Sequence, residues 1–257
     1  MSEKNGAKKV EKYYDRTTAS YLETYGSTIQ AYRPSNAEDL HQHVLDVTGI
    51  DDGMNVLDVG CGVAGPAVFF ASKKAAKIEG ITISQVQVDE GKKAASKANL
   101  KGSVNLTKGD FHHLNDYYSN TQFDVVLFLE SLGHSIAADG VLKDAFDLVK
   151  PGGCIYIKDF YPLEIDDETT RAKHQAVLDR INEAYSYNVL DLNDTLKGIR
   201  RAGFEIDFVK RFEFADDIEA RSAFETANGI DLYNGQPEFI VAEWLEIKCT
   251  KPVHPLF

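Results

Sequence analysis

The chain contains little of what marks a membrane, secreted or nucleic-acid-binding protein. No apolar run approaches the roughly 18 residues of a membrane span, and the first residues lack an apolar core, so we expect no signal peptide. The three cysteines, Cys61, Cys154 and Cys249, show no metal-ligand spacing, which predicts reduced thiols in a cytoplasmic protein. A formal charge of −12 without a lysine-rich tract argues against nucleic acid as a partner.

Patterns of strand and helix alternate along most of the chain. Its 257 residues, 43% of them hydrophobic, suffice for one large α/β domain or two small ones. The predicted strands are residues 54–59, 77–83, 103–108, 123–129 and 153–159. The predicted helices of this part are residues 65–76, 84–98 and 138–149. Such alternation predicts a parallel sheet with helices on both faces, which binds ligands at the carboxyl ends of its strands.

The pattern changes after the fifth predicted strand. A charged helix is predicted at residues 167–187, and a further helix ends at Ala202. Residues 204–212 and 238–249 have strand character, and residues 216–228 separate them. Because no convincing crossover helix connects these two strands, we expect an antiparallel hairpin at the edge of the sheet.

The most informative segment is residues 58–66, Asp-Val-Gly-Cys-Gly-Val-Ala-Gly-Pro, which joins a predicted strand to a predicted helix. Glycines let the backbone approach a ligand closely, and the N–H groups at a helix start point at it. A dinucleotide enzyme would need an acidic residue at the end of the second strand to hold the ribose. That strand ends at Thr82, and Glu79 comes too early. The segment therefore predicts a nucleotide-like cofactor other than a dinucleotide.

Three further features narrow the choice of cofactor. Asp58, inside the strand before the glycines, can hold an ammonium group by a charge-assisted hydrogen bond. Asp110, in Gly-Asp-Phe after the third strand, can accept from an adenine amino group, and residues 150–153, Lys-Pro-Gly-Gly, form a turn before the fifth strand. Together these motifs resemble class I S-adenosylmethionine-dependent methyltransferases over residues 50–250. The resemblance implies S-adenosyl-L-methionine as the cofactor.

Two segments resemble one branch of that family. Residues 80–87, Gly-Ile-Thr-Ile-Ser-Gln-Val-Gln, are similar to the GxTxSxxQ segment of cyclopropane fatty acid synthases, tocopherol methyltransferases and prenyl diphosphate C-methyltransferases, where Thr82 and Gln87 would hold the ribose hydroxyls. Tyr13-Tyr14-Asp15 resembles the opening of the same enzymes and of sterol C-methyltransferases, which folds over the cofactor. The implied cofactor-binding residues are Tyr14, Asp58, Gly60, Gly62, Thr82, Gln87, Asp110, Phe111 and Leu129.

Glu130 and His134, which follow the fourth strand, are the predicted catalytic residues. Their spacing is similar to the Glu-x-x-x-His of sterol C-methyltransferases, and prenyl diphosphate C-methyltransferases also have a glutamate here. An alkene that attacks a sulfonium methyl leaves a carbocation, which a carboxylate can stabilise and then deprotonate. Aromatic faces can stabilise the cation further. Alternatively, Glu130 holds the N-terminal loop or a substrate hydroxyl, and His134 is structural.

The favoured acceptor is a prenyl diphosphate, because the chain is shorter than sterol enzymes and we expect a smaller substrate. A diphosphate would need cations, and Mg²⁺ could bridge its oxygens; no metal site built from protein ligands alone is predicted. The candidate cations are Arg33, His41, His43, Arg171, His174 and Arg180. The predicted substrate-binding residues are Tyr21, Tyr32, Arg33, Arg171 and His174. Two alternatives stay open: an O- or N-methyltransferase of a small metabolite, and a cofactor-binding regulatory protein without activity.

The predicted fold class is α/β, a Rossmann-like sheet of seven mostly parallel strands with an antiparallel edge hairpin. Residues 1–49 are expected to form an N-terminal helical lid, in which residues 7–32 are helix broken by turns. Residues 50–257 are expected to form the methyltransferase core, with a substrate-facing helical insertion around residues 162–190. The expected partner is a small-molecule acceptor, and the sequence leaves open whether the chain forms a homo-oligomer.

Overall fold

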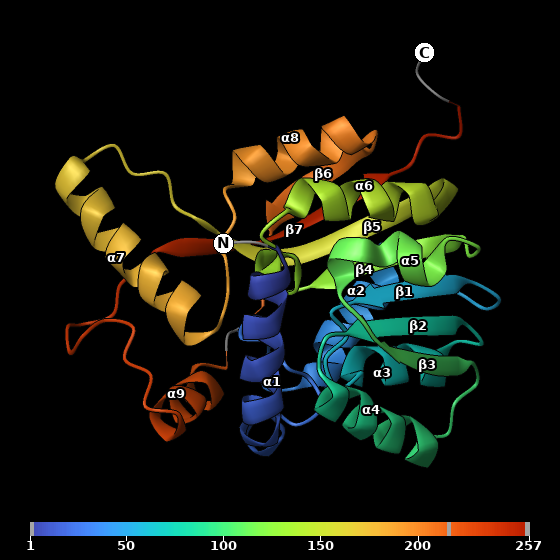
Figure 1. Cartoon of the computed structure of the whole chain (residues 1–257), viewed down its shortest axis with the longest axis horizontal. Helices are drawn as coiled ribbons and strands as arrows, with labels where there is room; N and C mark the ends of the chain where they lie inside the picture. The colour runs from blue at the N-terminus through green and yellow to red at the C-terminus, as the bar shows by residue number, and fades with distance from the viewer. Residues whose placement is uncertain (1–2, 215–216, 255–257) are drawn as a thin grey trace.

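The structure, a computed structural model, describes residues 3–214 and 217–254 (Figure 1). Its centre is one sheet of seven strands in the order β3-β2-β1-β4-β5-β7-β6. Strands β1 to β5 run parallel, and β7 lies antiparallel between β5 and β6. The strands are β1 (Asn55–Val59), β2 (Lys77–Thr82), β3 (Ser103–Lys108), β4 (Phe123–Leu129), β5 (Val149–Pro162), β6 (Glu205–Arg211) and β7 (Ala242–Thr250). This arrangement confirms the predicted fold class.

The order of the strands places the glycine-rich segment at a reversal point of the chain. From β1 the chain continues to β2 and β3 on one side, and β4 then pairs with β1 on the other side. The loops after β1 and β4 therefore diverge at the carboxyl edge of the sheet and leave room for a ligand between them. These loops begin at Gly60 and Glu130.

Helices cover both faces of the sheet (Figure 1). One layer holds α2 (Ala37–Thr48), α3 (Gly65–Lys73) and α4 (Gln85–Lys97), and the other holds α5 (Leu114–Tyr118), α6 (Ala138–Leu148) and α8 (Leu192–Ala202). Each layer buries its own apolar cluster against the sheet. Side-chain caps define several helix starts, because the side chains of Asn36, Ser84 and Asp191 accept from the first backbone N–H groups of α2, α4 and α8.

Helix α1 (Glu3–Tyr25) is continuous, so the prediction of a helix broken by turns was wrong. The hydroxyls of Thr17 and Thr18 donate to the carbonyls of Tyr13 and Tyr14, one turn earlier, and so do not interrupt the helix. Tyr13 and Tyr21 are buried in a cluster of aromatic residues that includes Phe224 of α9 (Ile218–Ala227). This packing, which local sequence does not reveal, keeps the helix intact.

The remaining elements lie beyond the carboxyl end of β5 and the adjacent start of β7. There α7 (Glu168–Ala184) and α9 stand apart from the two helix layers, and α1 contacts both α9 and α4 (Figure 1). The predicted antiparallel edge pair is present as β6 and β7, although α9 lies in the connection between them. Two short 3₁₀ helices, η1 (Phe111–His113) and η2 (Leu132–His134), follow β3 and β4. No helix of residues 3–214 and 217–254 is long and apolar enough to cross a bilayer.

Candidate active site

Two cavities meet at the carboxyl edge of the sheet. The first, which we call the glycine-loop cavity, is lined entirely by residues between 7 and 134. All nine predicted cofactor-binding residues line it, from the glycines after β1 to the acid after β3. The second, the aromatic cavity, has a volume of about 500 Å³ and lies towards α7, α9 and β7. Four side chains line both cavities: Tyr14, Ile29, Glu130 and His134.

The loop after β1 requires glycine for two reasons. Gly60 and Gly62 have φ values of +79° and +54°, which L side chains rarely adopt. A Cβ atom on Gly60 would also lie 2.5 Å from the Cβ of Ser131. The N–H groups of Gly60 and Cys61 donate to the carbonyl of Ile81 at 2.9 and 3.0 Å, which fixes the turn against β2. The loop thus exposes backbone rather than side chains to the glycine-loop cavity.

Asp58 carries a buried acceptor that suits the ammonium group of the implied cofactor. Its side chain is only 1% exposed, and its Oδ2 has no hydrogen-bond partner among the described residues. Burial raises the pKa of this carboxyl to about 7. An unpaired carboxylate oxygen in a cavity is costly unless a donor from a ligand meets it. The residues present therefore fit a cofactor that brings a cationic donor to this point.

The other cofactor contacts implied by the motifs are in place on their elements. The Thr82 hydroxyl donates to Gln87 Oε1 at 2.5 Å, which joins the end of β2 to the first turn of α4. Asp110 Oδ1 accepts from the backbone N–H of His112 at 3.0 Å and lies 2.6 Å from its Nδ1. These bonds fix the orientation of polar side chains that line the glycine-loop cavity.

Aromatic side chains dominate the wall of the aromatic cavity. Trp244 of β7 lies between Tyr32 and Phe160, with ring centroids 5.1 and 4.8 Å away. Tyr187 stacks on Phe160 with centroids 5.3 Å apart. Such faces exclude water and attract positive charge. The aromatic residues of the wall are Tyr14, Tyr21, Tyr25, Tyr32, Phe160, Tyr185, Tyr187, Phe212, Tyr233, Phe239 and Trp244.

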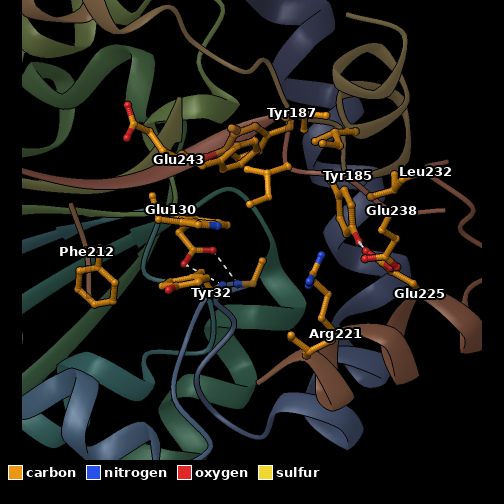
Figure 2. Close-up of a pocket in the computed structure, with 18 of the residues that line it drawn as sticks. Tyr32, Glu130, Tyr185, Tyr187, Phe212, Arg221, Glu225, Leu232, Glu238 and Glu243 are labelled. Carbon is orange, nitrogen blue, oxygen red and sulfur yellow. Dashed lines mark hydrogen bonds between the residues drawn. The ribbon is translucent and has the colours of Figure 1, made fainter. Parts of the chain in front are cut away.

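Glu130 forms the boundary between the two cavities. Its backbone is left-handed, with φ +56°, and this conformation turns the chain sharply at the end of β4. The carboxylate pairs with Lys158 of β5, and their side chains are 8% and 0% exposed. It also accepts from the N–H groups of Ala31 and Tyr32 at 2.6 and 3.4 Å (Figure 2). Burial raises the pKa of Glu130, and Lys158 opposes the rise.

Residues 50–201 match a family model described as "Methyltransferase domain". The chain belongs to this methyltransferase domain family. The result confirms the family that the glycine-rich segment, Asp58 and Asp110 indicated, and S-adenosylmethionine is the cofactor of that class.

Two curated relatives extend the comparison. Cycloartenol-C-24-methyltransferase 1 of Oryza sativa subsp. japonica is 30% identical over 218 residues, which cover 81% of this chain and 61% of that protein. Sterol 24-C-methyltransferase of Yarrowia lipolytica is 30% identical over 222 residues, 80% of this chain and 55% of that protein. The chain of this methyltransferase thus spans less than two thirds of the length of these relatives.

Solved structures share the fold at low identity. A [4+2]-cyclase, SpnF, superimposes with a TM-score of 0.79 and 22% identity over 96% of this chain and 97% of that one. Geranyl diphosphate methyltransferase in complex with GPP and sinefungin has a TM-score of 0.73 and 12% identity, over 96% and 99% of the two chains. At this level of identity, these similarities show the fold alone.

His134 of the methyltransferase is a neutral, buried hydrogen-bond bridge. Its Nδ1 lies 3.0 Å from the carbonyl of Ser186, which can only accept, so Nδ1 carries the proton. Burial lowers the pKa of the ring to about 4, and Nε2 is therefore an acceptor for the Tyr14 hydroxyl at 2.7 Å. His134 thereby anchors α1 over both cavities.

The predicted substrate residues divide into two groups. Tyr21 and Tyr32 line the aromatic cavity, and their contact with a substrate stays a prediction. Arg33 does not line it, because its guanidinium is buried against the carbonyl of Tyr25 at 2.7 Å. Arg171 is exposed and donates to the carbonyls of residues 165 and 166, and His174 packs behind the wall against Phe239.

The other three candidate cations also lie elsewhere. His41 bonds the Thr28 hydroxyl at 3.1 Å, and burial lowers its pKa to about 4. His43 pairs with Glu246 at 2.9 Å, and Arg180 donates to the carbonyl of residue 232. None of the six cations that the sequence suggested for a diphosphate lines the aromatic cavity in the described part of the chain.

Sequence reasoning missed several residues at the site. Lys158 and Asp159 are buried polar residues inside the apolar run of β5, a signal that was present in the sequence. Arg221 and Glu225 come from α9, a region that the sequence showed only as a separator between two strands. No local pattern indicates that α9 turns towards the cavity, because the long β6–β7 connection determines this.

The pH dependence of cofactor binding should report Asp58. Below a pKa of about 7 this carboxyl is protonated and must lose its proton to hold an ammonium group. The affinity for S-adenosylhomocysteine should therefore fall as pH falls below 7, by about tenfold per pH unit. Calorimetry across this range measures it, with Asp58→Asn as the control that lacks the titration. An equal slope in both proteins would contradict the assignment.

Cofactor should also protect the N-terminal segment from proteolysis. Residues of α1 and of the loop after it line the glycine-loop cavity, including Ala7, Tyr14 and Gln30. A ligand there adds contacts to this segment and makes its local opening rarer. We expect S-adenosylhomocysteine to slow cleavage near Tyr14, measured by limited proteolysis and mass spectrometry. Equal rates with and without the ligand would exclude a role as a lid over the cofactor.

Proposed function

We propose that the protein is an S-adenosylmethionine-dependent C-methyltransferase that methylates an alkene of a small, isoprenoid-like acceptor through a carbocation and its deprotonation. The observation that carries the proposal is the position of Glu130, a buried carboxylate between the glycine-loop cavity and a cavity walled by aromatic rings. Methyl transfer to oxygen or nitrogen needs no such surroundings. The sequence similarity to sterol 24-C-methyltransferases supports the same class of reaction.

The residues of the chain supply the environment for a cation. S-adenosylmethionine, when bound, provides an electrophilic methyl carbon. The negative charge of Glu130 and the faces of Tyr32 and Trp244 then stabilise positive charge on the acceptor carbon. The Tyr14 hydroxyl donates to His134, so its oxygen lone pairs remain available at the boundary of the cavities. Because the rings exclude water, each of these interactions is stronger than it would be in solvent.

The wall of the aromatic cavity favours a neutral acceptor over the prenyl diphosphate that the sequence suggested. Its described lysine and arginine side chains are Arg211 and Arg221, whereas its carboxylates are Glu130, Glu225, Glu238 and Glu243. Lys158 lies close by but is paired with Glu130. A diphosphate would meet more negative than positive charge here. Mg²⁺ was expected only as a bridge between diphosphate oxygens, so a neutral acceptor gives no reason to expect it.

A screen with methyl-labelled S-adenosylmethionine tests the proposal. The panel contains farnesol, cycloartenol, tocopherol precursors and fatty acids, together with geranyl, farnesyl and isopentenyl diphosphates. We expect label on carbon in a neutral alkene, retained after base hydrolysis and located by mass spectrometry. Label on oxygen or nitrogen, or transfer to no alkene, would reject C-methylation. Faster transfer to a diphosphate than to its alcohol would reject the neutral acceptor.

A further inference from the structure

The carboxylate of Glu130 is already ion-paired and hydrogen-bonded within the protein. Three donors approach its carboxylate: the ammonium of Lys158 and the N–H groups of Ala31 and Tyr32. Protonation of Glu130 would leave Lys158 buried without its counter-charge, which is unfavourable. Glu130 therefore stays ionised and is poorly placed to deprotonate a cation.

Asp159 is a second buried carboxylate at the same end of the aromatic cavity. It lies on β5, only 3% exposed, and accepts from the Tyr187 hydroxyl at 2.6 Å and from the N–H groups of Phe160 at 2.9 Å and Gly133 at 3.3 Å. Its neighbour Lys158 bonds Glu130 instead, since successive side chains of a strand point to opposite faces. Burial raises the pKa of Asp159 to about 7.

The groups that act electrostatically on Asp159 are acidic or phenolic, and the two basic groups next to it are neutral or paired: burial lowers the pKa of the His134 ring to about 4, and Lys158 pairs with Glu130. Glu130 approaches from the end of β4, Tyr14 from α1, Tyr161 from β5, and Tyr187 from the loop after α7. From β7, its register partner is the apolar Leu245. These neighbours make it easier for Asp159 to bind a proton than for an exposed aspartate.

Tyr187 connects Asp159 to the aromatic cavity. Its ring forms part of the cavity wall, and its hydroxyl points to the buried carboxylate. The ring is held between Phe160, on which it stacks, and His134, whose centroid lies 4.4 Å away. A Cβ on Gly133 would approach this ring to 2.1 Å, so glycine is needed there to admit it. The tyrosine is thus fixed between the aromatic cavity and Asp159.

We propose that Tyr187 and Asp159 together remove the proton that ends the reaction, with Tyr187 as the catalytic residue and Asp159 acting through it. The C–H bond next to the cationic carbon breaks, and its electron pair forms the new C=C bond. The proton goes to the Tyr187 oxygen as the phenol proton passes to Asp159 Oδ1. The inference rests on the proposed function, since only a carbocation requires this step.

The test follows the products and the pH profile of variants. The probe is whichever of farnesol and cycloartenol takes up label faster in the screen above. Tyr187→Phe and Asp159→Asn should lower kcat by roughly 10²-fold. Water should then capture the undeprotonated cation, so methylated alcohol should replace methylated alkene in the mass spectrum. At saturating cofactor, wild-type kcat should fall below pH 7, and this limb should disappear in Asp159→Asn. Because the cofactor is saturating, the loss of cofactor affinity on protonation of Asp58 does not contribute to this decrease in kcat.

Tyr185→Phe is the matched control, because Tyr185 also lines the aromatic cavity and also donates to a carboxylate, that of Glu225, at 2.8 Å (Figure 2). It should retain the wild-type ratio of alkene to alcohol. If Tyr187→Phe matches this control in kcat, product ratio and pH profile, the inference is overturned, even if Asp159→Asn fails to fold. Label found on oxygen or nitrogen instead overturns the proposed function, and with it the need for a base.

Discussion

Exchange of Glu130 for glutamine should lower turnover by about 10²–10⁴-fold, the range for a positioned charged group. The substitution keeps the size of the side chain and removes the charge that faces the acceptor. The amide oxygen can still accept from the N–H of Ala31 or Tyr32, so cofactor affinity should change far less than kcat. Steady-state kinetics on the acceptor and calorimetry with S-adenosylhomocysteine measure the two effects separately.

The buried pair with Lys158 complicates this variant and also provides its control. Glu130→Gln removes the counter-charge of a lysine of 0% exposure, and loss of one member of such a pair costs about 3–5 kcal/mol of stability. The double variant Glu130→Gln/Lys158→Met removes both charges and should recover much of that stability without recovering turnover. If the double variant regains near-normal turnover, Glu130 serves to hold the N-terminal loop, and its catalytic role is rejected.

Gly60→Ala should reduce the affinity for S-adenosylhomocysteine by roughly 100-fold. The left-handed backbone and the approach of the new Cβ to Ser131 at 2.5 Å both force the loop to shift. A strain of 1–3 kcal/mol corresponds to roughly 5- to 150-fold in affinity if the bound conformation must bear it. Calorimetry gives the affinity, and thermal unfolding shows whether the fold itself survives.

Gly53→Ala separates backbone strain from the clash. Gly53 has nearly the same φ, +80°, but a Cβ added to it would meet no described atom within 4 Å, and it does not line the glycine-loop cavity. Both variants should lose similar stability from the left-handed conformation. Only Gly60→Ala should lose cofactor affinity. Normal binding by Gly60→Ala would show that the loop adapts, and the assigned role of its close approach to Ser131 would be wrong.

The cofactor half of the site could be predicted from sequence because its residues follow local rules. Apart from Tyr14 of α1, each lies within five positions of the end of a strand, and parallel strands bring those ends to one edge. Asp58, Thr82 and Asp110 therefore converge without any knowledge of distant contacts. The strand boundaries were also predicted closely, although β5 extends from Val149 to Pro162 rather than from 153 to 159.

The acceptor half could not be predicted in the same way. Its wall depends on the positions of α7, α9 and the start of β7. The connections between these elements are long, so the sequence does not determine those positions. Arg171 and His174 were chosen from the right helix but from its first half, whereas Ile181 and the residues after it reach the cavity. The buried ion pair between Glu130 and Lys158 could not be predicted for a related reason. Lys158 is distant from Glu130 in sequence, and only the register of β5 against β4 brings the two side chains together.

The walls of the glycine-loop cavity and the aromatic cavity come from different parts of the chain, which has a consequence for evolution and for engineering. Residues 7–134 supply the whole glycine-loop cavity, whereas most of the aromatic cavity comes from residues 160–244. Substitutions at later residues that line only the aromatic cavity leave the lining of the glycine-loop cavity unchanged. Lineages of this fold can thus diverge in what they modify while inheriting one donor site. A library of variants confined to residues 160–244 would change the wall that faces the acceptor and leave the lining of the glycine-loop cavity unchanged.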